Sequence, residues 1–256
     1  MLLAIDIGNS NVTLGVYREN ELLFVARIAT DRNKTGDQYA VELYNLFHIY
    51  NLSAKDITGT IISSVVPVVG NAFQKAVKTI SGKTPMMVGP GVKTGLNIKI
   101  DNAAQLGADL VAGAVAAIDR YALPCIILDL GTANTISVVN EKGDFLGGVI
   151  SAGIGISLDA LTGRTAQLPQ IGIETPAHVI GTNTIDCMKS GLVFGTAAMI
   201  DGLIDRIEEE LGQEASLVAT GGLAPEIIKN CKHEIDLCDN LLLYGLKLIY
   251  EKNITK

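Results

Sequence analysis

The sequence predicts an α/β protein made of two similar halves. Three observations support this class: an internal repeat of strand-and-turn segments, apolar strand-like runs at the start of each half, and amphipathic segments with helical spacing after them. With 256 residues, 48% of them hydrophobic and 18% charged, the chain suits one large or two medium domains. The same composition excludes a disordered chain.

The internal repeat aligns LAIDIGNSNVT (3–13) with IILDLGTANTI (126–136). A constant offset of 123 residues pairs the Asp, Gly and Asn positions of the two segments: Asp6 with Asp129, Gly8 with Gly131, and Asn11 with Asn134. Each segment precedes another strand-like run, and the turns REN and NEKGD are typical of β-hairpins. Each half is therefore expected to open with a hairpin, giving domains 1–120 and 121–256.

Further elements follow from spacing, capping residues and turn residues. We expect a helix over 36–50, a strand over 59–67, a helix over 103–121 capped by Asp101 or Asn102, a helix over 186–211, and a strand over 216–222 followed by a helix near Pro225.

Charge and motif content exclude several classes of protein. The net charge of −7 does not suit a nucleic-acid or anionic-membrane binder, and no run of about 18 uncharged apolar residues predicts a membrane span. Asp6 interrupts the apolar N-terminus, which indicates a strand and not a signal peptide. The four cysteines form no CxxC pair and the three histidines have no metal-ligand spacing, so we expect a cytoplasmic protein with reduced thiols.

The repeated Asp-x-Gly turns suit phosphate chemistry. Gly permits close backbone approach, consecutive backbone N–H groups bind phosphate oxygens, and carboxylates bind the accompanying cation. One such turn alone would be an ordinary hairpin, whereas two in register could clamp a nucleotide's phosphate chain across a cleft. ATGGLA (219–224) is a third glycine turn, suited to adenine or ribose or simply to a strand–helix connection. The Walker A and GxGxxG motifs are absent.

In their order and spacing, DIGNSN (6–11), GADL (107–110), DLGTAN (129–134) and ATGGLA (219–224) resemble the type III pantothenate kinases. That family belongs to the acetate and sugar kinase, Hsp70 and actin superfamily. The resemblance implies two actin/Hsp70-like (ribonuclease H-like) domains, each a mixed sheet flanked by helices, with an active-site cleft between them. It implies ATP-dependent phosphorylation of pantothenate to 4′-phosphopantothenate, the first step of coenzyme A synthesis.

The resemblance also assigns nucleotide-binding residues. Asp129 would be the ligand of a monovalent cation (K⁺ or NH₄⁺), Thr132 would touch the ATP phosphates, and Asp6 would lie nearest the Mg²⁺–phosphate group. The first phosphate loop would comprise Asp6, Ile7, Gly8, Asn9, Ser10, Asn11, Val12 and Thr13.

On the acceptor side, the resemblance implies Asp109 as general base, a homodimer, and Thr184 closing on pantothenate from the partner subunit. The pantothenate loop would consist of Gly107, Ala108, Asp109 and Leu110. If the helix begins late, its positive end would keep Asp109 ionised. Alternatively, Asp109 is a helix-surface acid, Asp101 competes for the base role or caps the helix, and Thr184 is a helix cap.

The acceptor side also departs from the family pattern. Leu110 replaces an arginine that holds the pantothenate carboxylate, and Ile100 replaces a tyrosine. Three basic residues, Lys93, Lys99 and Arg164, are candidates for the missing charge, and the sequence does not choose among them. A kinase of the same fold acting on another small hydroxylated acceptor, a catalytically weakened accessory protein and an actin-like structural subunit remain alternatives.

Overall fold

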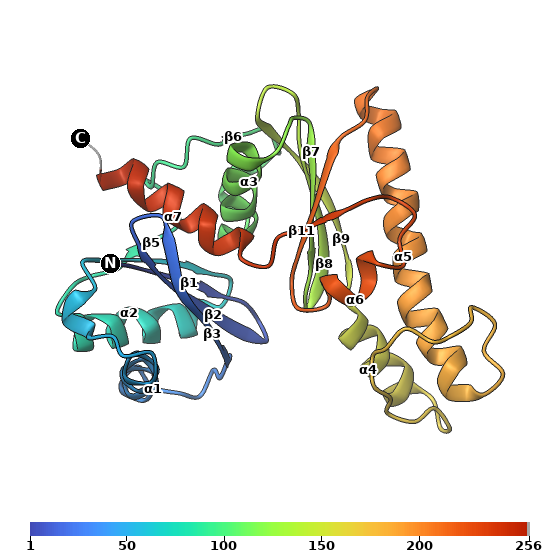
Figure 1. Cartoon of the computed structure of the whole chain (residues 1–256), viewed down its shortest axis with the longest axis horizontal. Helices are drawn as coiled ribbons and strands as arrows, with labels where there is room; N and C mark the ends of the chain where they lie inside the picture. Colours follow the sequence, from blue (N-terminus) through green and yellow to red (C-terminus); the bar gives the residue numbers. More distant parts are fainter. Residues whose placement is uncertain (255–256) are drawn as a thin grey trace. The chain divides into compact units, whose positions relative to one another are not determined.

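The structure, a computed structural model, describes residues 1–254, which divide into two compact units (Figure 1). The first unit comprises 1–96, 101–119 and the chain from Asn240 onward; the second comprises 97–100 and 120–239. The predicted domains 1–120 and 121–256 would group the C-terminal helix with the second half. Its contacts instead lie within the first unit.

The first unit is built on a five-stranded mixed sheet of order β3-β2-β1-β4-β5. The three N-terminal strands pair antiparallel, whereas β4 runs parallel to β1 and β5 parallel to β4. The strand bounds are β1 (Leu2–Ile7), β2 (Asn11–Arg18), β3 (Glu21–Ala29), β4 (Gly59–Ser64) and β5 (Met86–Met87). A 3₁₀ turn, Ala54–Asp56, precedes β4.

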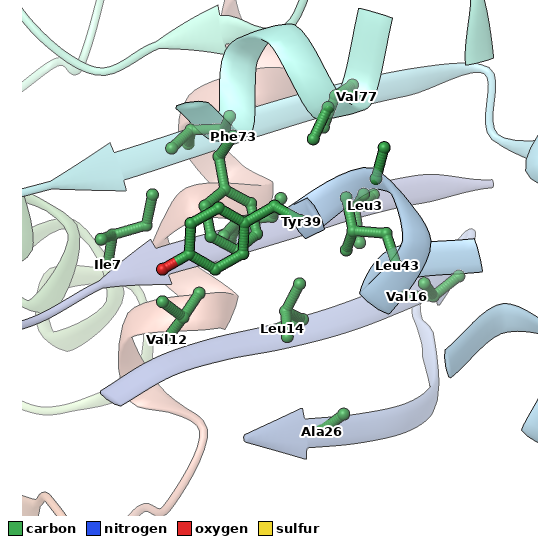
Figure 2. Packing of buried hydrophobic residues seen from close by; sticks show 14 of the residues in the cluster. Leu3, Ile7, Val12, Leu14, Val16, Ala26, Tyr39, Leu43, Phe73 and Val77 are labelled. Atoms are coloured by element: carbon green, nitrogen blue, oxygen red, sulfur yellow. The ribbon is translucent and has the colours of Figure 1, made fainter. Parts of the chain in front are cut away.

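One face of this sheet packs against α1 (Gly36–Ile49) and α2 (Pro67–Ser81). Alternate residues of β1 and β2 point into this core, where Figure 2 shows them around Tyr39 and Phe73. The two rings lie 4.3 Å apart between centroids. Thr35 begins α1 with a capping box, because its hydroxyl accepts from the backbone of Gln38 and its backbone N–H donates to the Gln38 side chain.

The opposite face of the sheet carries α7 (Leu241–Ile254), the last helix of the chain. Leu243 of α7 lies against Gly15 of β2, and Tyr250 lies against Gly59 of β4. This helix also meets α3 (Ala108–Arg120), because a Cβ atom on Gly245 would lie 1.9 Å from the carbonyl oxygen of Ala112. The first unit is therefore layered, with its sheet between α1/α2 and α7.

The second unit is built on a six-stranded sheet of order β11-β10-β7-β8-β9-β6. Its central hairpin, β7 paired antiparallel with β8, repeats the β1–β2 hairpin, and β10 lies parallel to β7 as β4 lies parallel to β1. The bounds are β6 (Asn97–Ile98), β7 (Cys125–Leu130), β8 (Ala133–Val139), β9 (Asp144–Ala152), β10 (Ser216–Thr220) and β11 (Asp236–Leu237).

Helices α4 (Ile154–Arg164), α5 (Thr184–Leu211) and α6 (Ala224–Ile228) bury the apolar face of this second sheet. By length and composition alone, α5 could span a membrane, with a mean hydropathy of 1.3 in its most apolar window. The buried side chains of α5 include Leu192, Val193, Ile200 and Ile204, which pack in the core of the second unit. Packing in this core accounts for part of its apolar character, since 44% of that window is buried.

Most expected elements are present, but the helix expected over 103–121 begins later. Asn102 caps a 3₁₀ turn, Ala103–Gln105, by accepting from the backbone N–H of Ala104. Leu106 is extended, and the α-helix starts only at Ala108. The predicted cap is therefore real, but it belongs to the short turn and not to α3.

A long irregular segment, residues 165–183, joins α4 to α5 and is held in place by Glu226 of α6. The Glu226 carboxylate accepts hydrogen bonds from the backbone N–H of Thr175 at 2.6 Å and from its hydroxyl at 2.5 Å. Lys229 forms an ion pair with the same carboxylate at 2.6 Å. The hydrogen bonds from Lys229 and Thr175 lower the pKa of Glu226 from 4.5 to about 2.

This contact predicts a pH-dependent contribution to stability. Because the pKa of Glu226 is lower in the folded chain, its contribution is present above about pH 4.5 and is lost as the pH falls toward about 2. We expect Glu226→Gln to lower the free energy of unfolding in urea at pH 7, with a difference from wild type that shrinks on acidification. Glu210→Gln, at an exposed position of α5, is the control. A difference that stays constant with pH would contradict this assignment.

Candidate functional site

The first glycine loop closes the β1–β2 hairpin over residues 8–11. The backbone N–H of Gly8 donates to the carbonyl of Asn11 at 2.9 Å. Thr30, just after β3, holds the loop from outside: its backbone N–H donates to Ser10 at 3.0 Å, and its hydroxyl donates to the Gly8 carbonyl at 2.7 Å. Asn9, Ser10 and Asn11 remain exposed, so the loop is available to a ligand.

The direction of Asp6 follows from the alternation along β1. Ile5 and Ile7 are fully buried in the core with α1 and α2, so Asp6 points to the other face. It is in register with Thr13 of β2 and Ser63 of β4, which share that face. Ile7 and Val12, both assigned to the loop, bury their side chains completely, so only their backbone could reach a ligand.

Ser63 is a polar residue of this site that sequence reasoning missed. It is fully buried, and its hydroxyl has no hydrogen-bond partner among residues 1–254. A buried unpaired hydroxyl beside a carboxylate is costly unless a ligand or water completes it. The available signal was a pair of serines at the carboxyl end of a buried parallel strand, where ligand-binding groups gather in α/β sheets.

The second glycine loop is one residue shorter than the first. Leu130 of β7 pairs with Asn134, whereas Ile7 of β1 pairs with Val12. The N–H of Gly131 accordingly donates to the carbonyl two positions later, at Ala133, over 3.2 Å. Asn134 therefore does not repeat the exposed position of Asn11 and is buried, with its amide donating to the Ala152 carbonyl at 3.3 Å.

Two other segments fix the backbone of this second loop. The N–H of Gly153, which begins α4, donates to the Thr132 carbonyl at 3.1 Å, and a Cβ atom there would lie 2.3 Å from the Gly131 carbonyl oxygen. Gly221 of the ATGGLA turn has a φ of +99°, and a Cβ atom there would lie 2.5 Å from the Leu130 carbonyl oxygen. These two segments can pack this closely against the loop only because glycine, which has no Cβ atom, stands at both positions.

Asp109 lies in the first turn of α3, and Gly107, which has no Cβ atom, leaves room for its side chain. A Cβ atom on Gly107 would lie 2.3 Å from Oδ1 of Asp109, and the backbone N–H of Leu110 donates to the same oxygen at 2.8 Å. Burial raises the pKa of Asp109 above its ordinary value of 3.8, against the opposing effect of backbone hydrogen bonds from Leu110 and Asp109 itself. The helix does begin late, at Ala108, which was the condition for its positive end to favour the ionised carboxylate, but desolvation has the largest effect on the pKa and raises it.

The remaining acceptor-side residues lie in different parts of the chain. Ala108 and Leu110 are partly buried in the first turn of α3. Thr184 is exposed at the start of α5 in the second unit, where Asn183 serves as the cap by accepting from the N–H of Asp186. Thr184 is thus not the capping residue. Ile100 packs near Gly147 in the second unit.

No group of three or more His, Cys, Asp or Glu residues within 1–254 could hold a metal ion by itself. This donor set suits Mg²⁺ that arrives with nucleotide phosphates, because Mg²⁺ is usually bound through one or two carboxylates together with substrate phosphates and water. Each hairpin carries one carboxylate beside its glycine loop, Asp6 at the end of β1 in the first unit and Asp129 at the end of β7 in the second.

The chain is similar to known proteins over nearly its whole length. The family model for type III pantothenate kinase matches residues 2–206. A type III pantothenate kinase from Halalkalibacterium halodurans is 46% identical over 255 residues, covering 99% of this chain and all of the relative. Another, from Moorella thermoacetica, is 42% identical over 257 residues with the same coverage of both chains.

Solved structures with low sequence identity share the fold. A Campylobacter jejuni chain described as a Baf family transcriptional activator has a TM-score of 0.63 at 19% identity, with 98% of each chain covered. A Listeria monocytogenes protein described as an N-acetylmannosamine kinase has a TM-score of 0.51 at 13% identity, covering 98% of this chain and 99% of that one. The predicted α/β fold is confirmed, and the family model together with relatives that match 99% of the chain shows that this chain belongs to the type III pantothenate kinase family.

Proposed function

We propose that this chain transfers the γ-phosphoryl group of ATP to the primary hydroxyl of pantothenate, giving 4′-phosphopantothenate for coenzyme A synthesis. Family membership supports the reaction class. The observation that carries the mechanism is Asp109, a partly buried carboxylate with a raised pKa, oriented at a helix start by Gly107. The protein is expected to be cytoplasmic and to act on a small molecule, without nucleic acid or membrane.

Asp109 acts as the general base in this proposal. Its carboxylate accepts the proton of the acceptor hydroxyl as the γ-phosphoryl group moves to that oxygen. A carboxylate with a raised pKa accepts a proton more readily than an ordinary surface aspartate. Asp101, the competing base, lies before the 3₁₀ turn and is exposed.

The two glycine loops bind ATP. The N–H groups of Gly8 and Gly131 close the loops, and the backbone N–H groups of Asn9, Ser10 and Thr132 donate to phosphate oxygens, with the Thr132 hydroxyl as a further donor. Mg²⁺, when bound with ATP, neutralises phosphate charge. Asp6 would lie nearest that ion, and Asp129 would bind a monovalent cation, K⁺ or NH₄⁺. Ser63 adds a hydroxyl on the face of Asp6.

The acceptor site in this proposal uses residues 107–110 of one protomer and Thr184 of its partner in a homodimer. Leu110 cannot hold the pantothenate carboxylate as arginine would. Of the three candidate replacements, Lys93 belongs to the same unit as Asp109, whereas Lys99 and Arg164 belong to the other. Asn253 fixes the backbone of Lys93. The Asn253 side chain accepts from the N–H of Lys93 at 3.0 Å and donates to the carbonyl of Lys93 at 2.9 Å.

Leu110 and Ile100 stand where the family has arginine and tyrosine. These two departures favour one alternative, a kinase of the same fold with a different hydroxylated acceptor. Both reactions release ADP, so the acceptor decides between them. A panel of small hydroxylated acids and amines, assayed beside pantothenate with ATP and Mg²⁺, separates the two. The highest kcat/KM for pantothenate supports the first proposal, and a higher value for another acceptor supports the alternative.

Asp109→Asn removes the base and keeps the shape of the side chain. We expect kcat to fall by about 10²- to 10⁴-fold with little change in the affinity for ATP. The wild-type rate should also decline in acid, starting above pH 3.8 because burial raises the pKa of Asp109. Steady-state ADP release against pH measures both effects, and undiminished turnover in the variant would rule out this base.

Gly107→Ala should displace the carboxylate without unfolding the chain. The new methyl group collides with the end of a flexible side chain, so we expect a loss of kcat of about tenfold or more and a change of less than about 1 kcal/mol in the free energy of unfolding. Gly163→Ala is the control, because a methyl group there meets no atom within 4 Å. Wild-type turnover in Gly107→Ala would show that this glycine does not position the base.

Asp129→Asn tests the monovalent cation. We expect wild-type turnover to be higher in KCl than in NaCl at equal ionic strength, and the variant to lose that preference. Initial rates in both salts provide the measurement. Equal wild-type rates in Na⁺ and K⁺ would remove the proposed role of Asp129.

A further inference from the structure

We propose that Arg32 is a phosphate-binding residue at the first loop, donating to the phosphate chain of ATP. This inference rests on the proposed nucleotide-binding function of that loop. The observation behind it is a guanidinium group whose Nη2 donates to Oδ1 of Asn9, inside the loop, at 3.2 Å.

The backbone before Arg32 is fixed to the loop. Thr30 donates two hydrogen bonds to the loop, one from its backbone N–H to the Ser10 carbonyl and one from its hydroxyl to the Gly8 carbonyl. These bonds place the chain that leaves β3 directly beside the glycine turn. Arg32 follows only two residues later, so its Cα cannot lie far from the loop.

The next residue, Asp31, is anchored to the core. The hydroxyl of Tyr39, whose ring is fully buried, donates to the Asp31 carbonyl at 2.8 Å and accepts from the Asp31 N–H at 3.0 Å. The Asp31 carboxylate accepts from the N–H of Asn33 at 2.9 Å. Arg32 is therefore presented from a turn held on both sides, which lowers the entropy lost when its side chain binds a ligand.

The charge of Arg32 is not neutralised within the described chain. Its side chain is exposed, and no carboxylate in residues 1–254 forms an ion pair with it. Lys34, two residues later, differs in this respect, because it forms an ion pair with Glu42. Arg32 is thus the cation of this turn that remains available to an anionic ligand.

The chemistry of the group suits phosphate. A guanidinium presents five N–H donors in a planar fork that matches phosphate oxygens, and the contact with Asn9 uses only part of them. Phosphoryl transfer depends mainly on positioning and charge stabilisation, which an arginine on the phosphate loop provides.

The test compares Arg32→Gln, which keeps a donor for Asn9 but no charge, with Arg32→Lys, which keeps the charge. Calorimetry with Mg²⁺-ATP needs no acceptor and therefore does not depend on the identity of the acceptor. We expect Arg32→Gln to weaken ATP binding about tenfold, with a smaller dependence of the dissociation constant on salt, and Arg32→Lys to recover part of the loss. Arg18→Met, at the far end of β2, about 20 Å along the strand, is the matched control and should bind like wild type.

Three results obtained with the variants would overturn the proposal. ATP affinity unchanged in Arg32→Gln would leave Arg32 only the contact with Asn9. A KM that rises for pantothenate and not for ATP would assign Arg32 to the acceptor carboxylate. Equal losses in Arg32→Gln and Arg18→Met would indicate a general charge effect. Wild-type chain that binds ATP but does not phosphorylate pantothenate would refute the proposed acceptor and leave the Arg32 test intact; absence of ATP binding would refute both.

Discussion

The burial of alternate side chains along two central strands sets the direction of the functional carboxylates. Leu3, Ile5 and Ile7 of β1 face α1 and α2, and each contributes about 2 kcal/mol when buried. In β7, Ile126, Leu128 and Leu130 face the helices of the second unit. Asp6 and Asp129 therefore point away from these two apolar clusters, and a shift of one residue in either strand would turn a carboxylate into its cluster.

The hairpins, the helices and the acidic residues at the turns were predictable because they depend on local periodicity and turn chemistry. The start of α3 was not, because an apparent cap at Asn102 serves a 3₁₀ turn and Leu106 then interrupts the helix. The lengths of the two loops also differ in a way that sequence alignment hides. Asn11 and Asn134 align by sequence, yet the strand register places Asn134 where the first hairpin has Val12.

Parts of the candidate site that depend on contacts distant in sequence were not predictable. The tether from Thr30 to the first loop joins residues 22 positions apart, and nothing in the TDRNK segment indicates it. For Ser63 the sequence offers only a pair of serines at the end of an apolar strand, whereas the structure shows that its hydroxyl is buried without a partner among the described residues. Gly107 was assigned to substrate binding by resemblance, whereas its geometry gives it a steric effect on the neighbouring carboxylate.

The position of α7 has a consequence for folding during synthesis. This helix covers one face of the sheet that begins with β1, although the two elements stand at opposite ends of the described chain. Residues 120–239 of the second unit emerge from the ribosome before α7 does. The N-terminal sheet, although made first, keeps the side chains around Gly15 and Gly59 without their helical cover until Leu243 and Tyr250 have been added. The half that is synthesised first is thus the half that is completed last. In the interval, the face of its sheet that α7 will cover presents apolar surface to which a chaperone can bind.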